Sequence, residues 1–395
     1  MVQRFRPWLP TLSLSFAAFI FITSEFMPIG ILTEIASRFS KSHAQTGLLI
    51  TVYAWVVALI SIPLTMGAAR INRRPLMLTI FGIFVIGQAL CVLSVNFEML
   101  LLSRLVIACA HAIFWSVVIP LAIRFAPADK GQHAMAIIAT GATLGTVLGV
   151  PLGTLLGQLA GWRFSFAAMG FCALIIELIL YRVLPSAPSR NAGGFRSIRA
   201  LLHRRTLMLC YLMTAIFMTG HFALYTYISP FLQTVGGLQK ELVATVLLVF
   251  GCAGMVGSFI APRLLMGYLK PSAYASIFVV ALCLAAIRLA APSYPATLVL
   301  MFIWSMGCMI FGLLVQHLVL AFAPEAADVA MAGNSAIFNV GIGTGALIGG
   351  LFADHHLASL GLVGAGFLGL ALVTCMMLLG EPLGVPRPQS QQPDQ

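Results

Sequence analysis

The residues that could do chemistry in this sequence are ionisable side chains inside long hydrophobic runs. Glu25 lies in the middle of the run from Leu9 to Ile35. That run is long enough to cross a bilayer, since crossing takes about 20 residues. An acidic side chain at the centre of a membrane helix costs at least about 2.5 kcal/mol on insertion scales, and intramembrane carboxylates commonly serve proton or ion pathways. We therefore expect Glu25 to be the proton-binding group of a transporter.

A polar stripe is predicted in the hydrophobic run 98–123. Arg104, Ala108, His111 and Trp115 follow one another at steps of four, three and four residues, which places them on one face of a helix. Intramembrane Arg and His on one stripe indicate a water-filled or paired environment. The alternatives are a structural ion pair or helix-end anchor for Arg104, and a hydrogen-bonded core position for His111. We assign Glu25, Arg104 and His111 to proton coupling, with the last two tuning or relaying the proton.

A second polar stripe lies in the run 206–232, where His221 and Tyr225 stand at helical spacing and Tyr227 is close by. Aromatic faces pack on sugar C–H surfaces and polar tips meet hydroxyl groups, so this stripe suits a polyhydroxylated ligand. Ordinary packing is the alternative for each tyrosine. The residues that we expect to bind substrate are His111, Trp115, His221, Tyr225, Tyr227, Trp304 and Asn339.

Glycines indicate an internal repeat. They recur every four residues in the run 133–159 and again in the run 331–353, and an offset of 200 residues superimposes the two stripes, Gly141 on Gly341. Such a stripe lets another helix approach closely, so ordinary helix packing is the alternative for each stripe alone. Many secondary transporters are built from internal repeats. The same offset places Glu25 approximately opposite His221 and Arg104 opposite Trp304.

The elements that must hold these residues are membrane spans. The chain has 395 residues, of which 60% are hydrophobic and only 8% charged, whereas soluble domains carry about 25% charged residues. We predict an all-α integral membrane protein with twelve spans in two pseudo-symmetric bundles of six. The spans are 9–35, 46–68, 75–95, 98–123, 133–159, 164–184, 206–232, 241–265, 272–291, 296–321, 331–353 and 358–380. The bundles cover 1–184 and 206–380, with a cytoplasmic linker at 185–205 and a cytoplasmic tail at 381–395.

The net charge of +11 follows the predicted topology and does not indicate nucleic-acid binding. With both termini on one side, sixteen of the 22 Lys and Arg residues lie on the terminus side and five on the other. This positive-inside bias places both termini in the cytoplasm. No short apolar run with a cleavage site precedes the first span, so we expect that span to be retained. The second half of the linker has the pattern of an amphipathic surface helix, and a solvated basic linker is the alternative.

The eight cysteines do not indicate a metal site or a disulfide framework. Each falls alone in a predicted span, with no CxxC pair and no Cys/His cluster. We expect no metal and no cofactor. An enzyme would need a metal cluster, or a nucleophile with a base and oxyanion donors, and the sequence shows no such constellation.

Several motifs carry a resemblance to a known family. They are Thr23-Ser24-Glu25-Phe26-Met27-Pro28, Tyr53-Ala54-Trp55-Val56-Val57, Ser103-Arg104, His111-Ala112-Ile113-Phe114-Trp115-Ser116, Gly149-Val150-Pro151-Leu152-Gly153, Gly161-Trp162-Arg163 and Ile337-Phe338-Asn339-Val340-Gly341. In this order they resemble the major facilitator superfamily, in particular its drug/sugar proton-antiporter branch and the bacterial sugar-efflux transporters.

The resemblance implies two six-helix bundles with the substrate site between them and alternating access. It maps the antiporter motif onto Gly145, Gly149, Pro151 and Gly153, and the fourth-span arginine onto Arg104. One departure concerns the segment 69–74, which lacks the aspartate that the family usually has before its basic cluster. That departure puts the usual inner-gate ion pair in doubt.

We expect export of small sugars across the bacterial inner membrane in exchange for protons, by a multi-pass protein that is a monomer among membrane lipids. A proton-coupled multidrug exporter of cationic or amphipathic compounds is the first alternative, because Glu25 would also attract cations and an aromatic cavity fits either ligand class. Uncoupled facilitation is the second.

Overall fold

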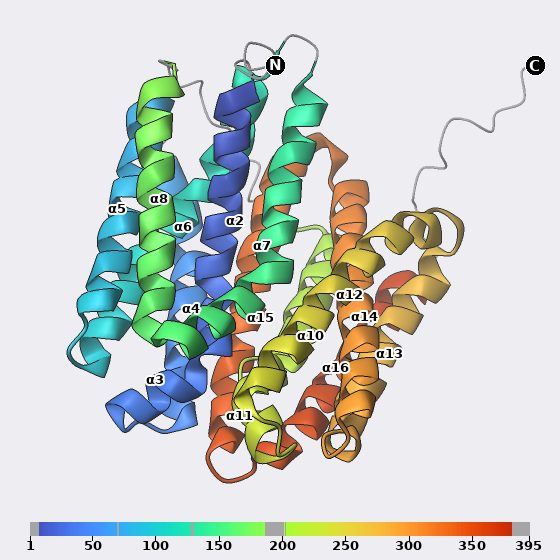
Figure 1. Ribbon diagram of the computed structural model, residues 1–395. Helices are drawn as coiled ribbons and strands as arrows, with labels where there is room; N and C mark the ends of the chain where they lie inside the picture. The colour runs from blue at the N-terminus through green and yellow to red at the C-terminus, as the bar shows by residue number, and fades with distance from the viewer. Residues whose placement is uncertain (1–7, 69–70, 128–129, 186–200, 202, 381–395) are drawn as a thin grey trace, which may run out of the picture.

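A computed structural model describes residues 8–68, 71–127, 130–185, 201 and 203–380. It consists of long helices that run between two opposite ends of the molecule (Figure 1). We call the end at which the first long helix begins the near end, and the opposite one the far end. Most of the predicted linker, with most of its proposed amphipathic helix, and the whole tail lie outside the described residues.

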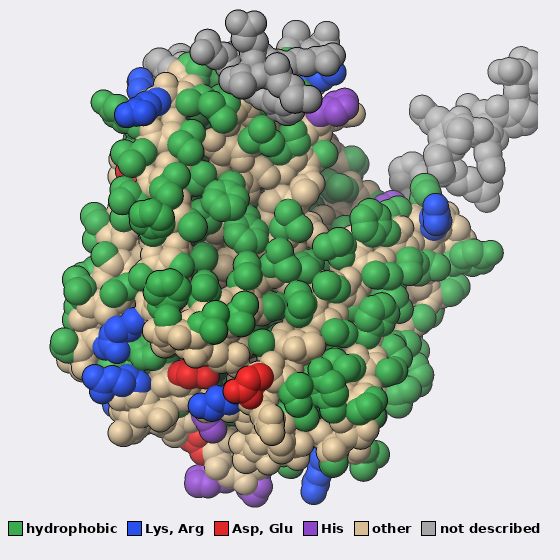
Figure 2. Space-filling view, in the orientation of Figure 1, with side chains coloured by type: hydrophobic (Ala, Val, Ile, Leu, Met, Phe, Trp, Pro, Cys, Tyr) green, Lys and Arg blue, Asp and Glu red, His purple; other side chains and the backbone are tan. Residues whose placement is uncertain are grey.

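Twelve helices in the described part of the chain are long and apolar enough to cross a membrane, which confirms the predicted number of spans. Hydrophobic side chains cover much of the visible face between the two ends (Figure 2). The spanning helices are α2 (Leu9–Gly30), α4 (His43–Gly67), α5 (Arg73–Leu93), α6 (Phe97–Phe125), α7 (Gly131–Ala160), α8 (Trp162–Val183), α10 (Arg205–Tyr225), α12 (Lys240–Gly267), α13 (Leu269–Ala290), α14 (Tyr294–Phe322), α15 (Ala327–Ala353) and α16 (Leu360–Gly380).

The first and seventh spans are each followed by a separate short helix at the far end. The predicted run 9–35 divides at Ile31 into α2 and α3 (Leu32–Phe39), and the run 206–232 divides after Tyr225 into α10 and α11 (Ile228–Thr234) (Figure 1). Two short 3-10 helices, Pro324–Ala326 and Leu357–Ser359, flank α15. The division of both runs at corresponding places supports a structural repeat.

The glycine stripes define the offset of that repeat. A β-carbon at Gly145 would lie 2.8 Å from the carbonyl oxygen of Phe19, and one at Gly341 would lie 2.9 Å from the carbonyl oxygen of Ala215. Gly341 follows Gly145 by 196 residues, and Ala215 follows Phe19 by the same number. The predicted offset of 200 is therefore wrong by four residues, because a glycine repeated every four residues matches itself after a shift of one repeat. Glu25 corresponds to His221 at 196, but Arg104 corresponds to Leu300 and not to Trp304.

The bundles meet along two seams, one formed by α4 and α15 and the other by α7 and α12. The seams are equivalent under the repeat. In one, Gly343 packs against Trp55, and in the other Gly251 packs against the backbone of Val147. A β-carbon at either glycine would overlap its neighbour. Pro151 has no N–H to donate to the Val147 carbonyl one turn earlier, and this free carbonyl is the group that Gly251 approaches.

A substitution in the stripe tests its packing role. A β-carbon at Gly149 would lie 2.9 Å from the Cα of Thr23, which is backbone and cannot swing away. Gly149→Val should therefore cost about 1–3 kcal/mol through overpacking. Its midpoint of thermal unfolding in detergent should fall clearly below that of Gly369→Val, since a β-carbon at Gly369 meets nothing within 4 Å. Equal midpoints for the two variants would show that α2 and α7 do not need this close approach.

Candidate functional site

Glu25 lies on α2 with only 7% of its surface exposed, and its carboxylate faces α6. Oε2 lies 3.7 Å from Nε2 of His111, which is 2% exposed. Two of the residues that the sequence assigned to proton coupling therefore lie next to each other. A carboxylate and an imidazole at this distance can share or exchange one proton with little movement.

Arg104 holds the backbone next to Glu25. Pro28 cannot donate to the carbonyl of Ser24, four residues earlier, so this carbonyl has no helical partner. Nη1 of Arg104 donates to it at 2.7 Å, and Nη2 donates to the carbonyl of Glu25 at 3.1 Å. The guanidinium carbon also lies 4.1 Å from the centroid of the Tyr53 ring. Arg104 thus replaces the hydrogen bond that Pro28 removes and positions Glu25 through the main chain.

Two neighbours determine which nitrogen of His111 carries its proton. Trp115 donates its indole N–H to Nε2 at 2.9 Å, and the hydroxyl of Tyr53 lies 2.9 Å from Nδ1. An indole nitrogen can only donate, so Nε2 is the acceptor and the neutral ring carries its hydrogen on Nδ1. Nε2 is also the atom that faces Glu25. A proton delivered from the carboxylate would therefore compete with Trp115 for the same lone pair.

Sequence reasoning did not assign a site role to two residues that complete this half. Tyr53 joins Arg104 to His111, and Gln88 on α5 donates to the hydroxyl of Ser24 at 2.6 Å. Both are fully buried. Tyr53 stands in the second-span motif, and Gln88 is a lone amide in an otherwise apolar span, which were the available signals.

The C-terminal half contains a matching histidine. Nδ1 of His221 accepts the indole N–H of Trp304 at 3.1 Å, so the neutral ring carries its hydrogen on Nε2. Tyr225 stacks on the imidazole with centroids 5.0 Å apart. Phe250 stacks on Tyr225 at 4.8 Å and meets Trp304 edge-on at 5.3 Å. We call His221, Tyr225, Phe250 and Trp304 the aromatic cluster. Phe250 was not predicted, because a phenylalanine in an apolar span gives no signal of its own.

Glu25 and His221 flank the axis that relates the two halves. Phe26 and Phe222 correspond to one another at the offset of 196, and their rings stack across the bundle boundary with centroids 5.9 Å apart. Residues related by a twofold axis can touch only where the axis passes between them. Each ionisable residue precedes one of these phenylalanines, so both lie close to the axis.

Two predicted substrate-binding residues make their side-chain hydrogen bonds outside the aromatic cluster. Tyr227 follows the end of α10, and its hydroxyl donates to the carbonyl of Ala346 at 2.8 Å in the α4–α15 seam. The chain leaves the helical path after Tyr225, so helical spacing does not carry Tyr227 onto the same face. Asn339 on α15 donates to the carbonyl of Ser335 in its own helix, while its Oδ1 is buried without a partner.

The glycine and proline residues of the predicted antiporter motif lie on α7, where they face α2 and the second seam. Gly145, Gly149 and Gly153 pack against Phe19, Thr23 and Met27, and Pro151 frees the Val147 carbonyl described above. The motif therefore determines how closely the helix that carries Glu25 approaches α7. Among the described residues, no group of three or more His, Cys, Asp or Glu side chains could hold a metal ion.

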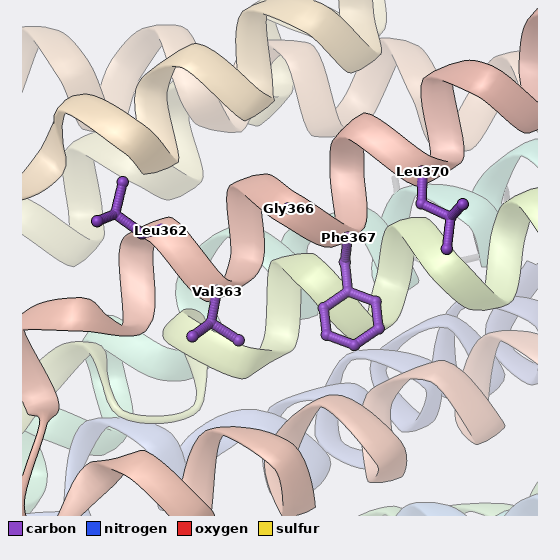
Figure 3. A pocket seen from close by; sticks show the side chains of 5 residues that line it. All are labelled: Leu362, Val363, Gly366, Phe367 and Leu370. Atoms are coloured by element: carbon purple, nitrogen blue, oxygen red, sulfur yellow. The ribbon is translucent and has the colours of Figure 1, made fainter.

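A surface hollow of about 260 Å³ lies on α16 and is lined by apolar residues of that helix alone (Figure 3). They are Leu362, Val363, Gly366, Phe367 and Leu370. The hollow has no side chain that could orient a polar ligand. We take it as part of the hydrophobic outer surface.

The relation between Arg104 and Pro28 can be tested by a double-mutant cycle. Arg104→Gln leaves the Ser24 carbonyl without its donor and should cost about 1.5–3 kcal/mol, the usual range for a charged hydrogen bond. In a Pro28→Ala background the new N–H serves that carbonyl, so the same change should cost less. The measurement is the midpoint of thermal unfolding, with Pro120→Ala on α6 as the control background. An equal loss in all three backgrounds would contradict the role given to Arg104.

Comparison with known proteins agrees with this architecture. Residues 14–332 match the model of the Major Facilitator Superfamily. The fold is similar to a bacterial homologue of the human lysosomal transporter Spinster in an inward-facing and unoccupied conformation, with a TM-score of 0.75, 19% identity, and 95% of this chain and 96% of that chain covered. A mutant of the nucleoside transporter NupG gives a TM-score of 0.76 at 12% identity, with 94% and 100% covered.

These matches confirm the expected fold and the expectation of a multi-pass membrane transporter that is not an enzyme. The matched family region runs from the α2 segment to the beginning of α15, and it includes Glu25, Arg104, His111 and the aromatic cluster. The chain belongs to the Major Facilitator Superfamily.

Proposed function

We propose that this transporter exports small sugars from the cytoplasm in exchange for protons, as a monomer in a bacterial inner membrane. The observation that carries the proposal is the buried carboxylate of Glu25, 3.7 Å from His111 and next to the axis between the two halves. Alternating access exposes groups near such an axis first to one side of the membrane and then to the other. A proton taken up on one side can therefore be released on the other.

The distribution of charge in the sequence gives the orientation. The excess of Lys and Arg on the terminus side supports a cytoplasmic near end. Three hydrogen bonds join the two bundles at the far end, between Ala44 and Asp354, Gln158 and Lys240, and Gln233 and Thr33. In this orientation the far end is external and closed, which corresponds to an inward-facing conformation.

The proton site has two places for one proton. A protonated Glu25 can donate its O–H toward Nε2 of His111, whereas an ionised Glu25 can attract the imidazolium form of the same ring. Both arrangements use the lone pair of Nε2, so each requires Trp115 to give up its bond to that atom. Trp115 is only partly buried, so a ligand that contacts its indole could shift the proton between the two places. When the ligand leaves Trp115 bonded to Nε2, neither the imidazolium nor the bond from the carboxyl group is available, so the pair would lose its proton to water on the open side.

The aromatic cluster supplies the features that a sugar needs. Because Nδ1 of His221 accepts from Trp304, its Nε2–H is available to a hydroxyl group. The Oδ1 atom of Asn339 is a second free group, an acceptor on the facing helix α15. Rings of Tyr225 and Phe250 can pack on the C–H face of a pyranose or furanose. Nucleosides carry a sugar ring too, so they belong among the candidate substrates.

A multidrug exporter is the competing function. An acidic side chain near aromatic rings also attracts organic cations, and Glu25 lies one residue from the stacked pair Phe26 and Phe222. Proteoliposome counterflow with a panel of sugars, nucleosides and cationic dyes separates the two functions. Sugar counterflow that cationic dyes do not inhibit supports our proposal, while the reverse pattern supports the multidrug exporter.

The proton role predicts a selective defect in Glu25→Gln. This variant should lose transport driven by a pH gradient by about 100-fold or more, the usual effect of removing a proton-transfer group, because glutamine cannot release a proton. Sugar counterflow without a gradient should persist, because it does not require deprotonation. Glu177→Gln is the matched control, a carboxylate on the peripheral span α8. Full gradient-driven transport by Glu25→Gln would exclude the assignment.

A further inference from the structure

The N-terminus of α4 is capped from the other bundle. The first N–H groups of a helix have no partner within it. Ser42 accepts the N–H of Gln45 through its hydroxyl, and Gln45 returns a bond to the N–H of Ser42, which is a complete capping box. The N–H of Ala44 donates instead to Oδ1 of Asp354 at 3.1 Å, and Asp354 directly follows α15. A carboxylate here also interacts favourably with the helix dipole.

The second seam has an equivalent bond. Nε2 of Gln158, near the end of α7, donates to the carbonyl of Lys240 at the start of α12 at 2.5 Å. Gln158 and Asp354 correspond at the offset of 196, and so do Ala44 and Lys240. The repeat therefore places a polar side chain from the end of one helix on the start of its seam partner, once in each seam. Asp354 accepts a bond there and carries charge, whereas Gln158 donates and is neutral.

The seam around the bond between Ala44 and Asp354 leaves little room for movement. A β-carbon at Gly350 would lie 2.9 Å from the hydroxyl of Tyr227 and 3.7 Å from the Cα of Ala44. A β-carbon at Gly47 would overlap the same hydroxyl, which donates to the Ala346 carbonyl at 2.8 Å. The two helices cannot separate at the far end without breaking the bond between Ala44 and Asp354.

We propose that Asp354 and Gln158 are a pair of latches that hold the far end of the transporter closed. They are positioning residues for the conformational change and do not touch substrate. Opening the far end removes the cap of α4 in one seam and the Gln158 bond in the other, so both raise the free energy of the open state relative to the closed one. The inference rests on alternating access and is independent of the substrate and of proton coupling.

Hydrogen–deuterium exchange of the full chain in nanodiscs tests the latches. Asp354→Ala should shift the ratio of far-end-open to far-end-closed molecules by about 2- to 30-fold, the range expected for one helix cap. Gln158→Ala should shift it by about 2- to 13-fold, the range expected for one neutral hydrogen bond. Uptake should rise at the starts of both α4 and α12 in each single variant, because the seams open together. It should fall at the starts of α7 and α15, because the near end closes as the far end opens. The double variant should show a larger shift than either.

Ser42→Ala is the control, because it removes the local cap of α4 and leaves the bond to Asp354 in place. Its uptake should rise only at the start of α4. Asp354→Asn keeps an acceptor without the charge and should give an intermediate shift. If Asp354→Ala and Gln158→Ala raise uptake only at the helix start that each one contacts, with no change at the near end, each residue stabilises only that helix start and the proposal is wrong.

Discussion

A single carbonyl oxygen governs the arrangement around Glu25. Pro28 leaves the carbonyl of Ser24 without a helical donor inside a membrane, where an unpaired backbone group is costly. Arg104 supplies the donor from α6 through Nη1, its Nη2 donates to the carbonyl of Glu25, and its guanidinium lies against the ring of Tyr53. Since a buried charge needs such partners, α2, α4 and α6 are joined at the position of the carboxylate. This junction therefore sets the position of the Glu25 carboxylate relative to His111.

The repeat at 196 residues gives the molecule its second constraint. Equivalent glycines, equivalent seams and the stacking of Phe26 on Phe222 all follow from it. The two halves differ in the residues around their corresponding positions Glu25 and His221. One half places Glu25 and Arg104 beside a histidine, whereas the other places a histidine among Tyr225, Phe250 and Trp304. A division into a proton-binding half and a ligand-binding half is consistent with these differences.

The sequence was sufficient to predict the twelve spans and the neighbourhood of Arg104, His111 and Trp115, because hydropathy and helical spacing act within one helix. Contacts between helices were harder to predict from the sequence. The bond from Arg104 to the Ser24 carbonyl joins two spans, and no spacing rule relates them. The offset of the repeat was ambiguous by one four-residue step, because the glycine stripe is self-similar. Tyr227 was placed with Tyr225 on the assumption of a continuous helix, which the structure interrupts between them.

The central claim is that substrate binding releases a proton from Glu25. A pH-indicator dye in weakly buffered solution, added to purified protein in detergent, reports this step directly without a membrane gradient. Addition of a transported sugar should acidify the solution with the unsubstituted protein and leave it unchanged with Glu25→Gln. Proton release of the same size from both proteins would contradict the account, because the proton would then come from another group.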